Sequence, residues 1–99
     1  MADANEAYLV EVSGRVQGVG YRAWTRSEAG RLGLEGWVRN EADGSVTALI
    51  AGPKAATATM LERFRVGPFG AKVTEVAARP IEVSELPAGH LPSGFSIDR

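Results

Sequence analysis

The sequence predicts an α+β domain in which two helices pack on one face of an antiparallel sheet. Several stretches alternate between apolar and polar residues, as half-buried strands do, and two others place apolar residues three and four positions apart, as helices do. A chain of 99 residues is long enough for one hydrophobic core and too short for two. We therefore expect residues 1–99 to form a single domain, with residues 1–6 flexible.

The first third of the chain predicts a strand, a glycine-rich loop and a helix. Residues 8–13 alternate in the manner of a half-buried strand. Three glycines follow within residues 14–20, so this segment is not regular structure throughout. From residue 21 to residue 32 the apolar spacing is helical, and Arg22 falls at the N-terminal end of the apolar stripe.

The middle of the chain predicts a hairpin and a second helix. Strands are expected at residues 34–40 and 45–51, and Asp43-Gly44 between them is a strong hairpin signal. Gly52-Pro53 is expected to open the second helix, because proline suits the first helical turn. The apolar face of that helix has the spacing i, i+3, i+4, i+7 and comprises Thr57, Met60, Leu61 and Phe64.

The last third of the chain predicts two more strands. One is expected within residues 71–82 and a short one at residues 95–97, separated by a connection rich in proline and glycine at residues 86–94. The order is then β-α-β-β-α-β with a small fifth strand, which is the ferredoxin-like arrangement. Domains with this fold include enzymes, RNA-binding modules and metabolite sensors, so the fold alone does not establish function.

The predicted topology brings two distant segments together. The first two strands are linked by a right-handed crossover through the first helix, so they run in the same direction. Their carboxyl ends therefore lie at one end of the sheet. The glycine-rich segment at residues 14–20 and Asn40, at the end of the second strand, are expected to meet there and to form a candidate site.

Composition narrows the possible functions. The chain has no cysteine, which excludes disulfides and thiolate chemistry and fits a cytoplasmic protein. A formal net charge of −1 and the absence of a basic-aromatic RNA-binding motif indicate no nucleic-acid partner. No apolar run approaches the roughly 20 residues of a membrane helix, so no membrane partner is expected. We expect a monomer.

Residues 14–22, which read Gly-Arg-Val-Gln-Gly-Val-Gly-Tyr-Arg, have the composition of an anion cradle. Backbone N–H groups of such a loop can converge on an anion, and a helix N-terminus adds unpaired N–H groups and the positive end of its dipole. The guanidinium of Arg22 can grip two phosphate oxygens. The alternative is a simple strand-to-helix turn with a solvated arginine, and the loop by itself leaves both interpretations open.

Two motifs resemble those of a known family. Residues 14–22 resemble the first signature of the acylphosphatases. Gly36-Trp-Val-Arg-Asn40, followed by Asp43-Gly44-Ser-Val46 and Gly52, resembles the second. The likeness extends over nearly the whole chain. It implies a small free-standing enzyme that hydrolyses acyl phosphates without a metal or other cofactor, and whose site accepts inorganic phosphate or a similar anion.

The resemblance also implies roles for individual residues. By this resemblance, Arg22 would be the phosphate-binding catalytic arginine, and Asn40 would orient the attacking water. The backbone N–H groups that complete the phosphate cradle would be those of Arg15, Val16, Gln17, Gly18 and Val19. Two positions depart from the family pattern: Tyr21 stands where phenylalanine is commoner, and Glu41 stands where some members have threonine. Glu41 is expected to add a negative charge near the anion site.

Other interpretations of these residues remain open from the sequence alone. Asparagine before a turn commonly caps that turn, so Asn40 has a purely structural alternative. The whole cradle could serve a non-catalytic module that binds a phosphorylated metabolite, or a domain of a larger carbamoyl-transfer enzyme. Among the remaining charged residues, we expect Arg39, Glu28 and Arg63 to be solvated, and His90 to be a surface residue rather than a metal ligand.

Overall fold

The order of helices and strands agrees with the prediction. A computed structural model of the chain describes residues 5–82 and 94–98. Its elements are β1 (Asn5–Arg15), α1 (Tyr21–Arg31), β2 (Glu35–Asn40), β3 (Val46–Pro53), α2 (Lys54–Phe64), β4 (Lys72–Ile81) and β5 (Phe95–Ile97). The predicted connection at residues 86–94 lies almost entirely outside the described residues.

The five strands form one sheet in the order β4-β1-β3-β2-β5. The first four are antiparallel to their neighbours, as expected, whereas β5 pairs with β2 in parallel. The predicted antiparallel arrangement thus holds for these four strands, and the short fifth strand, whose direction the sequence left open, makes the sheet mixed. The reason is geometric: β4 ends opposite the start of β1, at the end of the sheet where β2 also begins, and β5 then runs along β2 in the same direction.

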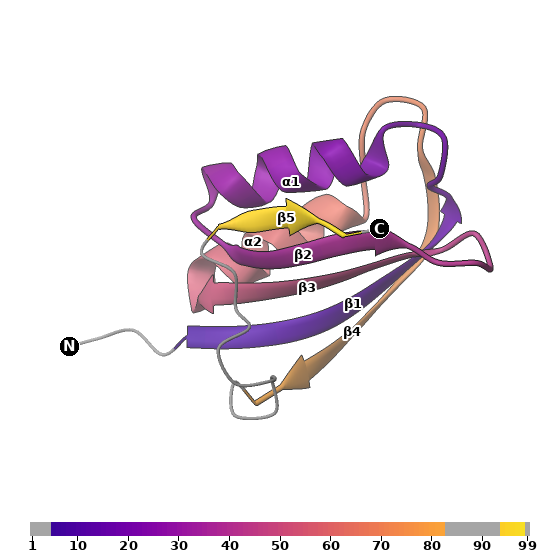
Figure 1. Cartoon of the computed structure of the whole chain (residues 1–99). Coiled ribbons are helices and arrows are strands. Elements are labelled where there is room, and N and C mark those ends of the chain that lie inside the picture. The colour runs from indigo at the N-terminus through magenta and orange to yellow at the C-terminus, as the bar shows by residue number, and fades with distance from the viewer. Residues whose placement is uncertain (1–4, 83–93, 99) are drawn as a thin grey trace.

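Both helices cover the same face of the sheet (Figure 1). Helix α1 contacts β2 and β5, and α2 contacts β1, β3 and β4. The core between the two layers consists of small and branched side chains from the strands together with larger ones from the helices. Its fully buried members include Val10, Val12, Val38, Val46, Ile50, Tyr21, Met60 and Phe64.

Two predicted boundaries differ from the structure. Strand β1 begins at Asn5, which pairs with Pro53, so Asn5 and Glu6 belong to the sheet rather than to a flexible N-terminus. Gly52 and Pro53 end β3 and do not open the helix. Pro53 has φ −60° and ψ 147°, so it is the extended residue before α2, which starts at Lys54. Strand pairing with β1 holds these two residues in the sheet.

An ion pair joins the two helices. We expected Glu28 and Arg63 to be solvated, but Glu28 is only 9% exposed. Its carboxylate is bonded by the guanidinium of Arg63 from α2 and lies 3.8 Å from that of Arg31. The prediction for Glu28 was wrong because this residue follows Thr25 by one turn and so lies on the edge of the buried stripe.

Tyr21 links the start of α1 to the end of α2. Its side chain is 1% exposed, and its hydroxyl donates a 2.7 Å hydrogen bond to the carbonyl oxygen of Phe64. That carbonyl is in the last turn of α2 and has no partner within the helix, so the phenol takes the place of a backbone donor. Burial raises the pKa of Tyr21, because the charged phenolate is disfavoured away from water.

Replacing Tyr21 by phenylalanine is expected to lower the free energy of unfolding by about 1–2 kcal/mol, because it leaves the carbonyl of Phe64 buried without a donor. Urea unfolding followed by circular dichroism at pH 7 measures the change. Tyr8→Phe is the matched control, since the Tyr8 hydroxyl bonds the side chain of Glu6 near the surface. Equal effects of the two substitutions would contradict the assignment.

Candidate active site

A backbone irregularity at the end of β1 turns the chain into the glycine-rich loop. The pairing of β1 with β4 shifts register between Ser13 and Gly14. Gly14 has φ 122°, and a Cβ atom there would lie 2.1 Å from the carbonyl oxygen of Lys72. Only glycine fits this close approach of two strands, so Gly14 allows β1 to bend while β4 remains paired with it.

The loop then leads directly into α1. Val16 is buried and anchors it to the core, while Gly18 stays exposed. Gly20 is the N-cap of α1 in a left-handed conformation, with φ 79° and no capping side chain. The first turn of the helix also lacks acidic residues. The N–H groups of this turn therefore keep the capacity to bind an anion, and the helix dipole favours one.

An open cavity of about 310 Å³ lies where this loop meets the end of β2. Its lining comes from the loop, the first turn of α1, β2 and β5, and comprises Val16, Gln17, Gly18, Gly20, Tyr21, Arg22, Ala23, Asn40 and Ile97. The topology argument predicted that Asn40 and the loop would meet, and the structure confirms that they do. Sequence reasoning missed Ile97, because parallel pairing of β5 with β2 is what brings it there.

Five of the seven predicted site residues line this cavity, and Arg15 and Val19 do not. Arg15 is the last residue of β1 and pairs with Lys72. Within residues 5–82 and 94–98, the side chains of Arg22 and Asn40 form no hydrogen bond or ion pair. A partly exposed guanidinium and a free amide thus share a cavity beside a helix N-terminus, which is an arrangement suited to a phosphate-sized anion.

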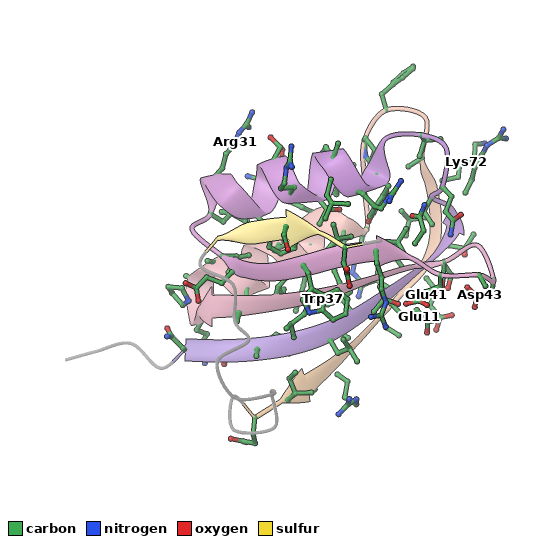
Figure 2. The ribbon with its side chains drawn as sticks, in the orientation of Figure 1. Glu11, Arg31, Trp37, Glu41, Asp43 and Lys72 are labelled. Carbon is green, nitrogen blue, oxygen red and sulfur yellow. The ribbon has the colours of Figure 1, made fainter. Side chains whose placement is uncertain are left out.

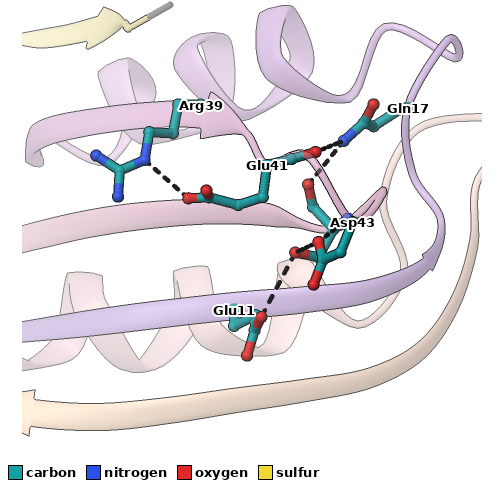
Figure 3. Close-up of polar contacts among 6 residues, drawn as sticks. Glu11, Gln17, Arg39, Glu41 and Asp43 are labelled. Atoms are coloured by element: carbon teal, nitrogen blue, oxygen red, sulfur yellow. Dashed lines mark hydrogen bonds and ion pairs between the residues drawn. The ribbon is translucent and has the colours of Figure 1, made fainter.

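Gln17 has a contact that the sequence did not reveal. We expected only its backbone N–H group to contribute, but its side-chain amide donates hydrogen bonds to the carbonyl oxygens of Glu41, at 2.8 Å, and Ser45, at 2.9 Å. These bonds join the loop to the turn between β2 and β3 (Figure 3). The one available signal was composition, since the chain has only three amide side chains and two of them are Gln17 and Asn40.

The charge of Glu41 is directed away from the cavity. Its carboxylate accepts a 2.8 Å bond from the Nε atom of Arg39, whose guanidinium lies 4.7 Å from the ring centre of Trp37. Arg39 and Trp37 alternate with Val38 and therefore lie on the sheet face opposite the helices. The bond from Arg39 lowers the pKa of Glu41. Glu41 does not line the cavity, and the effect of its charge on an anion there stays a prediction.

The turn that follows Asn40 is held by its own polar contacts. Asp43 accepts hydrogen bonds from the hydroxyl of Ser45, at 2.6 Å, and from its backbone N–H group, at 2.9 Å. These bonds lower the pKa of Asp43. The Ser45 hydroxyl also lies 3.4 Å from a carboxylate oxygen of Glu11, so Glu11, Glu41 and Asp43 gather at this end of the sheet (Figure 2).

Metal-binding groups and membrane spans are absent from the described part of the chain. No group of three or more histidine, cysteine, aspartate or glutamate side chains there is placed to hold a metal ion. The single histidine, His90, lies outside the described residues. No helix among residues 5–82 and 94–98 has the length and apolar character needed to cross a membrane.

Comparison with known proteins places the chain among related ones. The acylphosphatase family model matches residues 8–97. Proteins named acylphosphatase from Rhizobium etli and Rhizobium meliloti are 59% and 58% identical to it, over 88% and 90% of this chain and 93% and 94% of their own lengths. The crystal structure of acylphosphatase from Bacillus subtilis aligns with a TM-score of 0.85 at 36% identity and covers 95% of this chain and 99% of its own.

The fold and the cavity define a ferredoxin-like α+β domain with a candidate anion site between a glycine-rich loop and the end of the second strand. The sequence identity to the Rhizobium proteins extends over nearly their whole length, and this identity shows to which family of such domains the chain belongs. The chain belongs to the acylphosphatase family.

The lowered pKa of Asp43 gives a testable pH dependence. A carboxyl whose pKa is lower in the folded than in the unfolded protein stabilises the fold above its unfolded pKa, and this stabilisation is lost as the pH falls through the folded pKa. Ser45→Ala removes the hydroxyl bond, so the pKa of Asp43 is expected to rise toward its ordinary value. Carbon-13 NMR titration of the carboxyl groups measures the shift. An unchanged Asp43 titration in Ser45→Ala would show that the hydroxyl bond is not the cause.

Proposed function

We propose that the protein hydrolyses acyl phosphates to a carboxylate and inorganic phosphate. The observation that carries this proposal is that Arg22 and Asn40 line one cavity at the N-terminus of α1 together with Val16, Gln17, Gly18 and Gly20 of the loop. Membership of the acylphosphatase family supports the same activity. The substrate would enter with its phosphoryl group against the loop and its acyl group toward the open side of the cavity.

Binding of the phosphoryl group is assigned to the loop and to Arg22. Backbone N–H groups of residues 15–19 and of the first turn of α1 would donate to the phosphoryl oxygens. Arg22 is the one basic side chain among the described residues that line the cavity. Its planar guanidinium can donate two parallel hydrogen bonds and balance the charge that spreads over the equatorial oxygens in the transition state.

Asn40 is assigned to the attacking water. Its side-chain oxygen accepts a hydrogen bond from the water, which leaves a lone pair of the water oxygen free to attack phosphorus opposite the acyl oxygen. The new bond forms between the water oxygen and phosphorus, and the bond between phosphorus and the acyl oxygen breaks. The leaving carboxylate needs no proton at neutral pH. The proton from water passes to a phosphoryl oxygen, so inorganic phosphate is released.

The remaining expectations about the molecule are also proposals. We propose that the protein acts as a monomer, in which Arg22, Asn40 and the loop of a single chain supply the whole site. A cytoplasmic location is in keeping with a chain of 99 residues that has no cysteine.

Hydrolysis of benzoyl phosphate in the presence of EDTA tests the proposed activity. We expect turnover by the intact protein, and a loss of at least about 100-fold in kcat/KM in both Arg22→Gln and Asn40→Ala, because each removes a group that acts on the transition state. Asn40→Ala is expected to keep its affinity for inorganic phosphate, whereas Arg22→Gln is expected to lose it.

Arg26→Gln is the matched control, because Arg26 is an exposed arginine of the same helix that does not line the cavity. Its activity should equal that of the intact protein. If the intact protein binds phosphate with no turnover of benzoyl, acetyl or carbamoyl phosphate, the catalytic proposal fails. A non-catalytic module that binds a phosphorylated metabolite is then the better account.

A further inference from the structure

We propose that the side chain of Gln17 is a positioning residue that sets the distance between the phosphate-binding loop and Asn40. This inference rests on the proposed function, since it concerns how the two halves of that site are kept in place. It gives Gln17 a role beyond the backbone N–H group that the loop would offer to phosphate.

The hydrogen bonds of Gln17 are directed at one small structure. The turn between β2 and β3 is closed by a bond from the N–H group of Glu41 to the carbonyl oxygen of Ser45, at 2.9 Å. Gln17 Nε2 donates to that same Ser45 carbonyl and to the carbonyl of Glu41. The amide therefore places its two N–H groups on both ends of the turn, which lie 24 and 28 residues further along the chain.

These contacts join the two chemical functions of the site. Gln17 is in the middle of the loop, and both it and Asn40 line the cavity. Asn40 directly precedes Glu41, whose carbonyl Gln17 holds. No other side-chain hydrogen bond among the described residues connects the loop of residues 16–20 to this turn. The side-chain amide of Gln17 is thus the direct polar link between the loop, which would bind the phosphoryl group, and the turn that follows Asn40, the residue that would bind the water.

The chemistry of the side chain suits this role. Two carbonyl acceptors require two donors on one atom, and an uncharged amide supplies them without adding charge beside an anion site. Lysine or arginine would bring a competing cation, and glutamate would present a carboxylate to two carbonyl oxygens. Because alignment of reacting groups is sensitive to displacements of about 1 Å, a loosened bridge is expected to affect the chemical step more than binding.

Gln17→Met tests the proposal, because methionine has a similar length and no N–H donor. With benzoyl phosphate we expect kcat to fall by roughly 10- to 100-fold. KM and the inhibition constant of inorganic phosphate should change much less, because the backbone N–H groups of the loop and Arg22 remain. Gln17→Glu, which repels both carbonyl oxygens, should lose at least as much kcat as Gln17→Met.

Asp43→Ala is the matched control. It removes the acceptor of the two Ser45 bonds and so weakens the same turn, but it leaves the carbonyls that Gln17 holds. We expect it to lower the melting temperature and to leave kcat nearly unchanged. Should the Gln17 variants instead lose kcat only in proportion to their melting temperature, or lose phosphate affinity as strongly as kcat, the positioning role is overturned.

An NMR measurement separates this proposal from the catalytic one. Titration with inorganic phosphate should shift the loop amides and the side-chain amide of Asn40 in the intact protein. In Gln17→Met the loop amides should still shift, while the response of Asn40 should be reduced. This holds even if the intact protein proves unable to turn over substrate. An equal response of Asn40 in the two proteins overturns the positioning role and leaves the catalytic proposal intact.

Discussion

Strands β1 and β2 run in the same direction because both pair antiparallel with β3, and the position of each group around the cavity follows from this alignment. The right-handed crossover through α1 places the helix N-terminus at the carboxyl ends of both strands. The loop after β1 and the turn after β2 therefore begin at the same level of the sheet. The topology thus brings the loop and the turn to the same end of the sheet. The bend at Gly14 and the hydrogen bonds of Gln17 then fix the position of the loop relative to the turn.

The sequence predicted the elements well, because each has a strong local pattern, and it predicted the meeting of the loop with Asn40, because strand direction follows from element order. What it could not predict depends on contacts between distant segments. The bridge from Gln17 to the turn is one example. The pairing of Glu28 with Arg63 across two helices is another, since each residue looks solvated on its own helix. Ile97 is a third example: it lines the cavity because β5 pairs with β2 in parallel, and no local sequence pattern indicates that pairing.

The electrostatics of the cavity are local. The chain carries a formal charge of −1, so its overall field does not attract anions. Positive potential at the cavity comes instead from Arg22 and the start of α1, while the carboxylate of Glu41, which follows β2 directly, is held by Arg39 on the other side of the sheet. An acidic residue thus follows Asn40 in the chain without lining the cavity, because strand alternation places the two side chains on opposite faces of the sheet.

The two outer strands of the sheet, β4 and β5, affect whether the sheets of two molecules can pair edge to edge. An edge strand presents unpaired backbone groups that can pair with another molecule. On one side, β5 covers β2 with only three residues, which is a short template. The other edge, β4, carries Lys72, Glu75 and Arg79 and also contains Pro80, which has no N–H group to donate. Among the described residues, both margins of the sheet therefore have features that disfavour strand addition between molecules.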